Sequence, residues 1–162
     1  REYVEAASLV KKKYPNATFT VLGKIDEENP GGLKQAELDA LKAKGVIEHP
    51  GHVSNVSEWI RKHDVFVLPS YREGVPVSTQ EAMACGKAII TTDVPGCRET
   101  VVEGVNGLFV PPWDAEKLAE KMIWMIEHPE RVLQMGIESR KLAEERFDAI
   151  KQNKKLADWI LS

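Results

Sequence analysis

The sequence predicts one α/β domain in which helices cover both faces of a doubly wound, Rossmann-like parallel sheet. Apolar segments alternate along the chain with longer segments of helical periodicity, as expected for βαβ units. Residues 64–70 and 87–93 are apolar almost without interruption, which is typical of strands buried on both faces. The length of 162 residues is that of a single domain.

The N-terminal half is predicted to contain three helices and two strands. Residues 1–15 show helical periodicity and stop at Pro15. Residues 17–23 are rich in β-branched side chains and end at Gly23, which indicates a strand. The other expected elements are a loop at 24–32, a helix at 33–45, a strand at 45–51 and a helix at 53–63 that begins at Ser54 or Asn55.

The C-terminal half is predicted to contain three strands and ends in helices. The strands are expected at 64–70, 87–93 and 106–112, with helices at 75–86 and 97–104 between them. From Asp114 onward the pattern is helical, with a break at His128-Pro129. Ligands of such sheets bind beyond the carboxyl ends of the strands, so the loop after Leu68 is the first place to look for a site.

Composition and charge exclude several classes of function. The net charge of −3 gives no basic field, so we expect no nucleic-acid partner. Cys85 and Cys97 are too few for a disulfide framework, and the first residues lack the pattern of a signal peptide. We therefore expect a cytoplasmic protein with reduced thiols. The four histidines are scattered without metal-ligand spacing, so no metal is expected.

The segment Ser70–Gly86, SYREGVPVSTQEAMACG, carries the most specific signal for a site. Gly74 lets the backbone approach a ligand, and Pro76 suits the first turn of a helix. Free N–H groups near Val77 and Ser78 would face the crevice and favour a phosphate. The segment has neither the GK[ST] of a Walker loop nor a dinucleotide GxGxxG.

Two glutamates of this segment lack an obvious partner. Glu81 is expected inside a closely packed, buried helix, where its carboxylate can accept hydrogen bonds from the vicinal hydroxyls of a ribose. Glu73 precedes the turn and would lie beside a second sugar across a diphosphate. From spacing alone, Glu81 could equally cap a loop or pair with Arg72 or Arg98, and the spacing favours a solvated loop residue for Glu73.

The context of these glutamates resembles a known family. Residues 68–112, LPSYREGVPVSTQEAMACGKAIITTDVPGCRETVVEGVNGLFVPP, are similar to the donor-binding half of GT-B retaining glycosyltransferases of family four, also called group 1. Members carry EG-x-P-x4-EAMA-x-G-x-P-I-I, then G-x-x-E and G-x-N-G-x-L-V-P. The resemblance covers about residues 1–130 and implies the C-terminal half of a GT-B fold. Lys87 stands where the family usually has proline.

The resemblance implies roles for individual residues. Glu73 corresponds to the catalytic-site glutamate that contacts the transferred sugar, and Glu81 to the glutamate that binds the ribose. The amides of the following turn correspond to the diphosphate contacts of the family. A second loop corresponds to the loop that flanks the nucleotide base. These donor-binding positions are Gly74, Val75, Pro76, Val77 and Ser78 in the first segment and His52 and Val53 in the second.

The resemblance also implies what the chain binds. We expect a nucleotide-sugar donor, a UDP-sugar, and a lipid-linked or polysaccharide acceptor held by an N-terminal domain, with no metal or other cofactor. Neither that domain, nor the first strand, nor the basic G-R-x(n)-K-G segment is found in residues 1–162. We therefore expect a fragment that binds donor weakly and does not turn over. The helix expected at 147–162 would pack on the missing domain or associate peripherally with the inner face of a membrane.

Two alternatives stay open at this point. A nucleotide-sugar epimerase of similar architecture would share the fold, although the EGxP and EAMA motifs argue against it. A non-catalytic domain that only binds nucleotide-sugar is the other alternative, and the presence of both Glu73 and Glu81 argues against that one.

Overall fold

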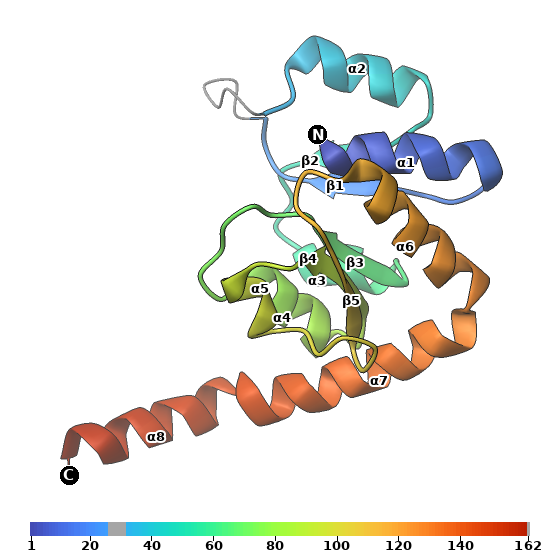
Figure 1. Ribbon diagram of the computed structural model, residues 1–162. Coiled ribbons are helices and arrows are strands. Elements are labelled where there is room, and N and C mark those ends of the chain that lie inside the picture. The colour runs from blue at the N-terminus through green and yellow to red at the C-terminus, as the bar shows by residue number, and fades with distance from the viewer. Residues whose placement is uncertain (26–31, 162) are drawn as a thin grey trace.

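The computed structural model describes residues 1–25 and 32–161, in which parallel strands form a middle layer between two layers of helices (Figure 1). The strands are β1 (Thr20–Leu22), β2 (Glu48–Gly51), β3 (Val65–Leu68), β4 (Ala88–Thr92) and β5 (Gly107–Val110). The helices are α1 (Glu2–Lys13), α2 (Gln35–Ala43), α3 (Val56–Arg61), α4 (Val77–Ala84), α5 (Pro95–Arg98), α6 (Ala115–Glu127), α7 (Pro129–Arg146) and α8 (Ala149–Leu161). The predicted three-layer α/β class is confirmed. Most of the loop expected at 24–32 lies outside the described residues.

The strands form two parallel sheets rather than the single sheet that the sequence suggested. β1 pairs with β2, and β3, β4 and β5 follow one another in that order. β1 and β3 line opposite sides of a gap and are not hydrogen-bonded neighbours. From this gap the strand order runs outward both ways, from β1 to β2 and from β3 to β5. Such a reversal is a topological switch point, where open α/β sheets bind their ligands.

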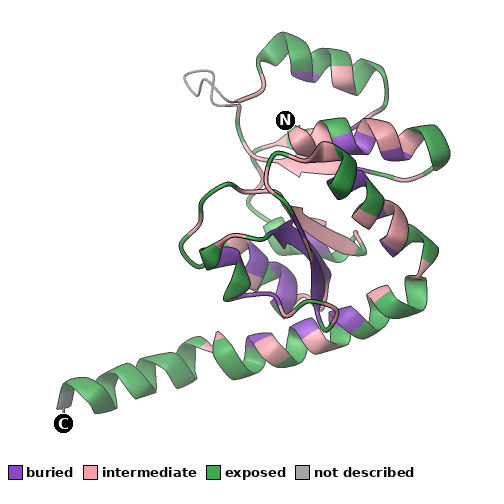
Figure 2. Cartoon of the chain, in the orientation of Figure 1, coloured by how far each residue is buried: buried purple, intermediate pink, exposed green. Residues whose placement is uncertain are grey.

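β4 is the central strand of the larger sheet, and all five of its residues are buried (Figure 2). Ala88 and Ile90 pack in one apolar cluster with residues of α1 and α6, whereas Ile89 packs in another with residues of α4 and α7. This alternation is that of a strand, and it places α1 and α6 on one face and α4 on the other, while α7 contributes Met135 to the first cluster and Ala143 to the second. The register sets Ile90 between Val67 of β3 and Leu108 of β5.

Most element ends follow the local signals of the sequence. Gly86 follows α4 with a φ of +69°, a left-handed conformation that suits glycine after a helix. His128 ends α6 and precedes Pro129 at the start of α7, so the predicted break is confirmed. Asp114 caps α6, because its Oδ1 accepts a hydrogen bond from the Lys117 N–H at 2.8 Å.

Other boundaries differ from those expected. The helix expected at 97–104 is instead the single turn α5, with Pro95 at its first position. The chain then bends around buried Asn106, whose Oδ1 accepts from the Val102 N–H at 2.7 Å and whose Nδ2 donates to the Thr100 carbonyl at 3.1 Å. Pro76 is the N-cap of α4 rather than part of its first turn. The strands expected at 17–23 and 45–51 are shortened to β1 and β2.

The helix expected at 147–162 is α8, which continues from the end of α7 away from the sheets (Figures 1 and 2). Its described side chains are exposed, including the apolar Ile150, Leu156 and Ile160. Across residues 1–25 and 32–161, no helix is both long enough and apolar enough to cross a bilayer.

Candidate donor site at the gap between the sheets

Two cavities lie beside the gap between β1 and β3. The larger, of about 620 Å³, is lined by Thr20–Leu22 of β1 and Val65–Leu68 of β3, together with Gly23 and Pro69 just beyond their carboxyl ends. The smaller, of about 470 Å³, is lined by residues before β1 and around the start of β3, together with residues of α6 and α7. The larger cavity therefore opens at the carboxyl edge, where a ligand is expected.

Two side chains contact Thr20 of β1. The Tyr3 hydroxyl of α1 donates to the Thr20 carbonyl at 3.3 Å, and burial raises the pKa of Tyr3 to about 12. The Thr20 hydroxyl lies 2.8 Å from His63 Nε2, while His63 Nδ1 lies 2.8 Å from the Trp59 carbonyl. The contact with His63 joins β1 to the segment just before β3, across the gap.

Four residues predicted from sequence come together at the larger cavity. His52 and Val53 reach it from the loop after β2, and Ser78 and Glu81 reach it from α4. The two pairs are separated by 24 intervening residues, 54–77, and meet only because β1 and β3 lie on either side of the gap. The other predicted residues of this segment do not line this cavity; Glu73, Gly74, Val75 and Pro76 precede α4, and Val77 is its first residue.

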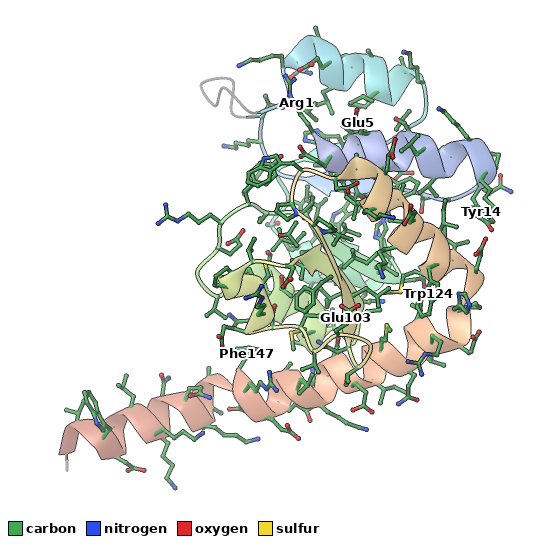
Figure 3. The ribbon with its side chains drawn as sticks, viewed as in Figure 1. Arg1, Glu5, Tyr14, Glu103, Trp124 and Phe147 are labelled. Carbon is green, nitrogen blue, oxygen red and sulfur yellow. The ribbon has the colours of Figure 1, made fainter. Side chains whose placement is uncertain are left out.

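Arg1, labelled in Figure 3 at the start of α1, is a cavity residue that sequence reasoning missed. Helix α1 precedes β1, and in a βαβ unit the helix begins at the carboxyl edge of the sheet. The position of α1 in the element order was thus the signal that could have found it. Gly23 was read only as the end of a strand, although it also lines the cavity.

The start of α4 is suited to an anion. Pro76 is its N-cap, and no side chain accepts a hydrogen bond from the first N–H groups of the helix. Ala82 and Met83 anchor the opposite side of α4 in the core, while Val77 is exposed. The hydroxyl of buried Thr79 has no hydrogen-bond partner among the described residues. An uncapped helix start beside a cavity favours a phosphate group.

Glu81 is exposed in the structure rather than buried as expected. The buried face of α4 is made by its neighbours Ala82 and Met83, so the helix turns the carboxylate toward the cavity. Within the described residues Glu81 forms no ion pair. The alternative partner Arg98 binds Asp93 instead, with Nε 2.7 Å from Oδ1, and this hydrogen bond lowers the pKa of Asp93.

Glu73 lies in a loop whose backbone is held from two sides. Its carboxylate accepts a hydrogen bond from Ser70 Oγ at 2.6 Å, and the Thr92 hydroxyl donates to the Ser70 carbonyl. On the other side α5 approaches so closely that a Cβ on Gly96 would lie 1.7 Å from the Gly74 carbonyl oxygen. The loop that carries Glu73 is therefore fixed by the sheet and by α5 rather than by its own packing.

A metal site requires several His, Cys, Asp or Glu side chains grouped around one point. Among residues 1–25 and 32–161, no three His, Cys, Asp or Glu side chains are grouped closely enough to hold an ion. The lining of the larger cavity includes the carboxylate of Glu81, and the start of α4 lies beside it. Its other polar side chains are three hydroxyls, two imidazoles and two cations, namely Tyr3, Thr20, Ser78, His52, His63, Arg1 and Lys87. This set can bind a polyhydroxylated, phosphorylated molecule through hydrogen bonds.

Known proteins share both the sequence pattern and the fold. An N-acetylgalactosaminyltransferase of Campylobacter jejuni, named for the acceptor N,N'-diacetylbacillosaminyl-diphospho-undecaprenol, is 39% identical over 127 residues, which are 78% of this chain and 32% of that protein. The capsular polysaccharide glycosyltransferase CapM of Staphylococcus aureus is 28% identical over 148 residues, 91% of this chain and 38% of that protein. The chain thus spans about a third of the length of these relatives.

Solved structures agree with this comparison. HepE of Anabaena, crystallised with UDP, superposes with a TM-score of 0.86 at 21% identity, covering 97% of this chain and 44% of that one. The C-terminal domain of the group 1 glycosyl transferase LpcC of Francisella tularensis superposes with a TM-score of 0.80 at 26% identity, covering 91% and 78%. The family model "Glycosyl transferases group 1" matches residues 1–128. The chain therefore belongs to the group 1 glycosyl transferases.

Proposed function

We propose that this chain is the donor-binding domain of a retaining glycosyltransferase that uses a UDP-sugar. The observation that carries the proposal is the cavity at the switch point, where Glu81, Ser78 and His52 converge on the carboxyl edge of the sheets. UDP is the nucleotide bound by the Anabaena structural neighbour, which supports the choice of base.

The geometry suggests one orientation for the donor. The diphosphate lies at the uncapped start of α4, where the N–H groups of Val77 and Ser78 donate to its oxygens. The ribose hydroxyls donate to the carboxylate of Glu81, and the uracil lies against His52 and Val53. The transferred sugar then extends toward the loop of Glu73.

In this account the chain promotes departure of UDP rather than forming a covalent intermediate. Negative charge grows on the β-phosphate as the glycosidic bond breaks, and the N-terminus of α4 stabilises that charge without reorganising. Glu73 is held by Ser70 and positions the sugar through hydrogen bonds. No metal is assigned a role in this proposal.

The acceptor is proposed to be a lipid-linked or polysaccharide intermediate. The Campylobacter jejuni relative is named for an undecaprenol-linked acceptor and the Staphylococcus aureus relative for capsular polysaccharide. Because the chain spans only about a third of these relatives, we assign acceptor binding to the remaining part of the longer protein. The fragment by itself is expected to bind donor weakly and to transfer no sugar.

We propose that in the longer protein the gap between β1 and β3 holds one further parallel strand. Backbone N–H and C=O groups on facing edges of β1 and β3 need partners, and the larger cavity runs along the length of both strands. Amide exchange along β1 and β3 should slow when the native preceding residues are added to the chain. Unchanged exchange would rule the extra strand out.

We further propose that α8 packs on the part of the longer protein that binds the acceptor. Its apolar Ile150, Leu156 and Ile160 are exposed, while Lys151 and Lys154 belong to the polar face of an amphipathic helix. If α8 instead binds peripherally to a membrane, the chain will sediment with anionic vesicles, and Leu156→Glu will abolish that binding.

Calorimetric titration with UDP tests the proposed function. We expect a dissociation constant in the millimolar range, about −4 kcal/mol, because we propose that the longer protein supplies further donor contacts. Glu81→Gln should weaken binding about tenfold or more, since a charged acceptor of two hydroxyls is lost. Glu145→Gln, an exposed change on α7, is the matched control and should have no effect.

Three results would contradict the proposal. They are the absence of UDP binding to both the fragment and the full-length protein, unchanged binding in Glu81→Gln, and preference for GDP over UDP. With the full-length protein, product analysis separates glycosyl transfer from epimerisation of the donor.

A further inference from the structure

Two exposed aromatic side chains stack on each other at the carboxyl edge of the larger sheet. Tyr71 lies in the loop after β3 and Trp113 in the loop after β5, so they flank the end of β4. Their ring centroids are 4.6 Å apart and their planes differ by 15°. The residues remain 44% and 67% exposed, so the stacked pair is accessible to solvent.

The backbone of Trp113 adopts an unfavourable conformation. Its φ is +60°, and within residues 1–25 and 32–161 it alone among non-glycine residues has a positive φ. A bulky side chain in this region carries a steric cost that glycine avoids. A turn that served only to connect β5 to α6 would be less strained with glycine, so the turn does not explain the tryptophan.

The Tyr71 hydroxyl lies close to the carboxylate of Glu2. The interaction with Glu2, with partial desolvation, raises the pKa of Tyr71 to about 12. The same loop carries Glu73, which is itself oriented by Ser70. The aromatic pair thus has a carboxylate at one edge and adjoins the loop that is proposed to contact the transferred sugar.

We propose that Tyr71 and Trp113 form a stacking platform for a pyranose ring. The C–H bonds on one face of a pyranose carry partial positive charge and pack on the electron-rich face of an aromatic ring. Hydroxyl groups at the rim of the sugar donate to nearby carboxylates. The inference rests on the proposed glycosyltransferase function and names a sugar subsite within it.

The platform suits a sugar better than the nucleotide. The uracil is placed by His52 and Val53, which reach the cavity from the loop after β2. Tyr71 and Trp113 belong to loops of the other sheet and do not line that cavity. The pyranose belongs either to the donor or to the acceptor, and the experiment distinguishes these two sources.

Saturation-transfer NMR on the chain, with the methyl glycosides of N-acetylgalactosamine and glucose as probes, tests the platform. We expect transfer to the ring protons of at least one glycoside, or tighter binding of the matching UDP-sugar than of UDP. Trp113→Gly should weaken the contact about two- to tenfold, the range for one aromatic interaction. Its melting temperature should not fall, because glycine tolerates the φ of this position.

Two control variants separate stacking from other effects. Tyr71→Phe keeps the ring and loses the bond to Glu2, so the sugar contact should persist. Trp159→Ala removes an exposed tryptophan on α8 and should leave the sugar contact unchanged. If Trp113→Gly removes only glycoside binding, the platform serves the acceptor; if it removes only the advantage of UDP-sugar over UDP, it serves the donor.

The proposal is overturned if the wild-type chain shows neither saturation transfer to a glycoside nor tighter binding of UDP-sugar than of UDP. It is equally overturned if Trp113→Gly leaves both measurements unchanged. It is also overturned if Trp113→Gly unfolds at a lower temperature and Tyr71→Phe loses the sugar contact as well. In that case the aromatic pair stabilises the fold and does not bind a sugar. Intact glycoside binding without any UDP binding would support the platform while contradicting the function proposed above.

Discussion

The two sheets differ in the support that their strands receive, although both are parallel. β4 has a partner on each side and is buried throughout, whereas β1 pairs only with β2, and all three of its residues are partly exposed. Thr20 and Val21 are β-branched and favour strands, so weak propensity does not explain the difference. The partial exposure of β1 follows from its position at the gap, which is also where the predicted donor residues converge.

The largest expected effect comes from breaking the supported sheet at its centre. Ile90→Ala removes a fully buried side chain of β4, and it should cost about 2–5 kcal/mol of unfolding free energy through lost burial and a residual cavity. Val21→Ala is the matched change in β1, and it should cost about 1 kcal/mol because that side chain is only half-buried. Denaturant unfolding measures both. Equal costs would show that the two sheets are supported alike.

A second change tests how α5 fixes the loop of Glu73. Gly96→Ala places a Cβ against the carbonyl oxygens of Glu73 and Gly74, so it should cost about 1–3 kcal/mol and weaken UDP binding. Gly74→Ala is the control, because a Cβ there meets nothing within 4 Å. The control should change stability by less than about 0.5 kcal/mol. If Gly96→Ala and Gly74→Ala have the same melting temperature, close packing by α5 does not hold this loop in place.

The smallest expected effect concerns Tyr3, which links α1 to β1. Tyr3→Phe loses the hydrogen bond to the Thr20 carbonyl and should cost about 1 kcal/mol at neutral pH. Burial raises the pKa of Tyr3 from 10.0 to about 12. The folded state therefore holds the proton more tightly, and this part of the stability is complete below pH 10 and lost as the pH rises to 12.

The measurement is unfolding free energy against pH for both proteins. Wild type should lose stability more steeply than Tyr3→Phe between pH 10 and pH 12, so the difference between them narrows or reverses. Parallel curves across this window would mean that Tyr3 titrates normally and that its contact with β1 is weak.

Much of the fold was predictable because its signals are local. The continuous apolar run of β4, the glycine after α4 and the proline at position 129 each act within a few residues, and the structure agrees with all three. The end of α5 was not predictable in the same way. It depends on Asn106, which reaches back to bond Thr100 and Val102, and no helical pattern reports such a contact.

The candidate site was predictable in part. The residue types and spacing of Glu73 and Glu81 indicated a donor loop, but the exposure of Glu81 depends on which side of α4 meets the core. The contribution of Arg1 depends on where α1 begins relative to the sheet. The strained φ of Trp113 is likewise a tertiary property, since the sequence Pro-Pro-Trp-Asp reads only as a turn before a helix.

Hydrogen exchange with and without UDP is the most direct test of the claim that the donor binds where the two sheets meet. UDP should slow exchange on both sides of the gap, at residues 51–56 after β2 and at residues 74–81 at the start of α4. The smaller cavity, lined by Phe19, Asp64 and Val132, should show no change. Protection at the smaller cavity, or on one side of the gap alone, would contradict this account.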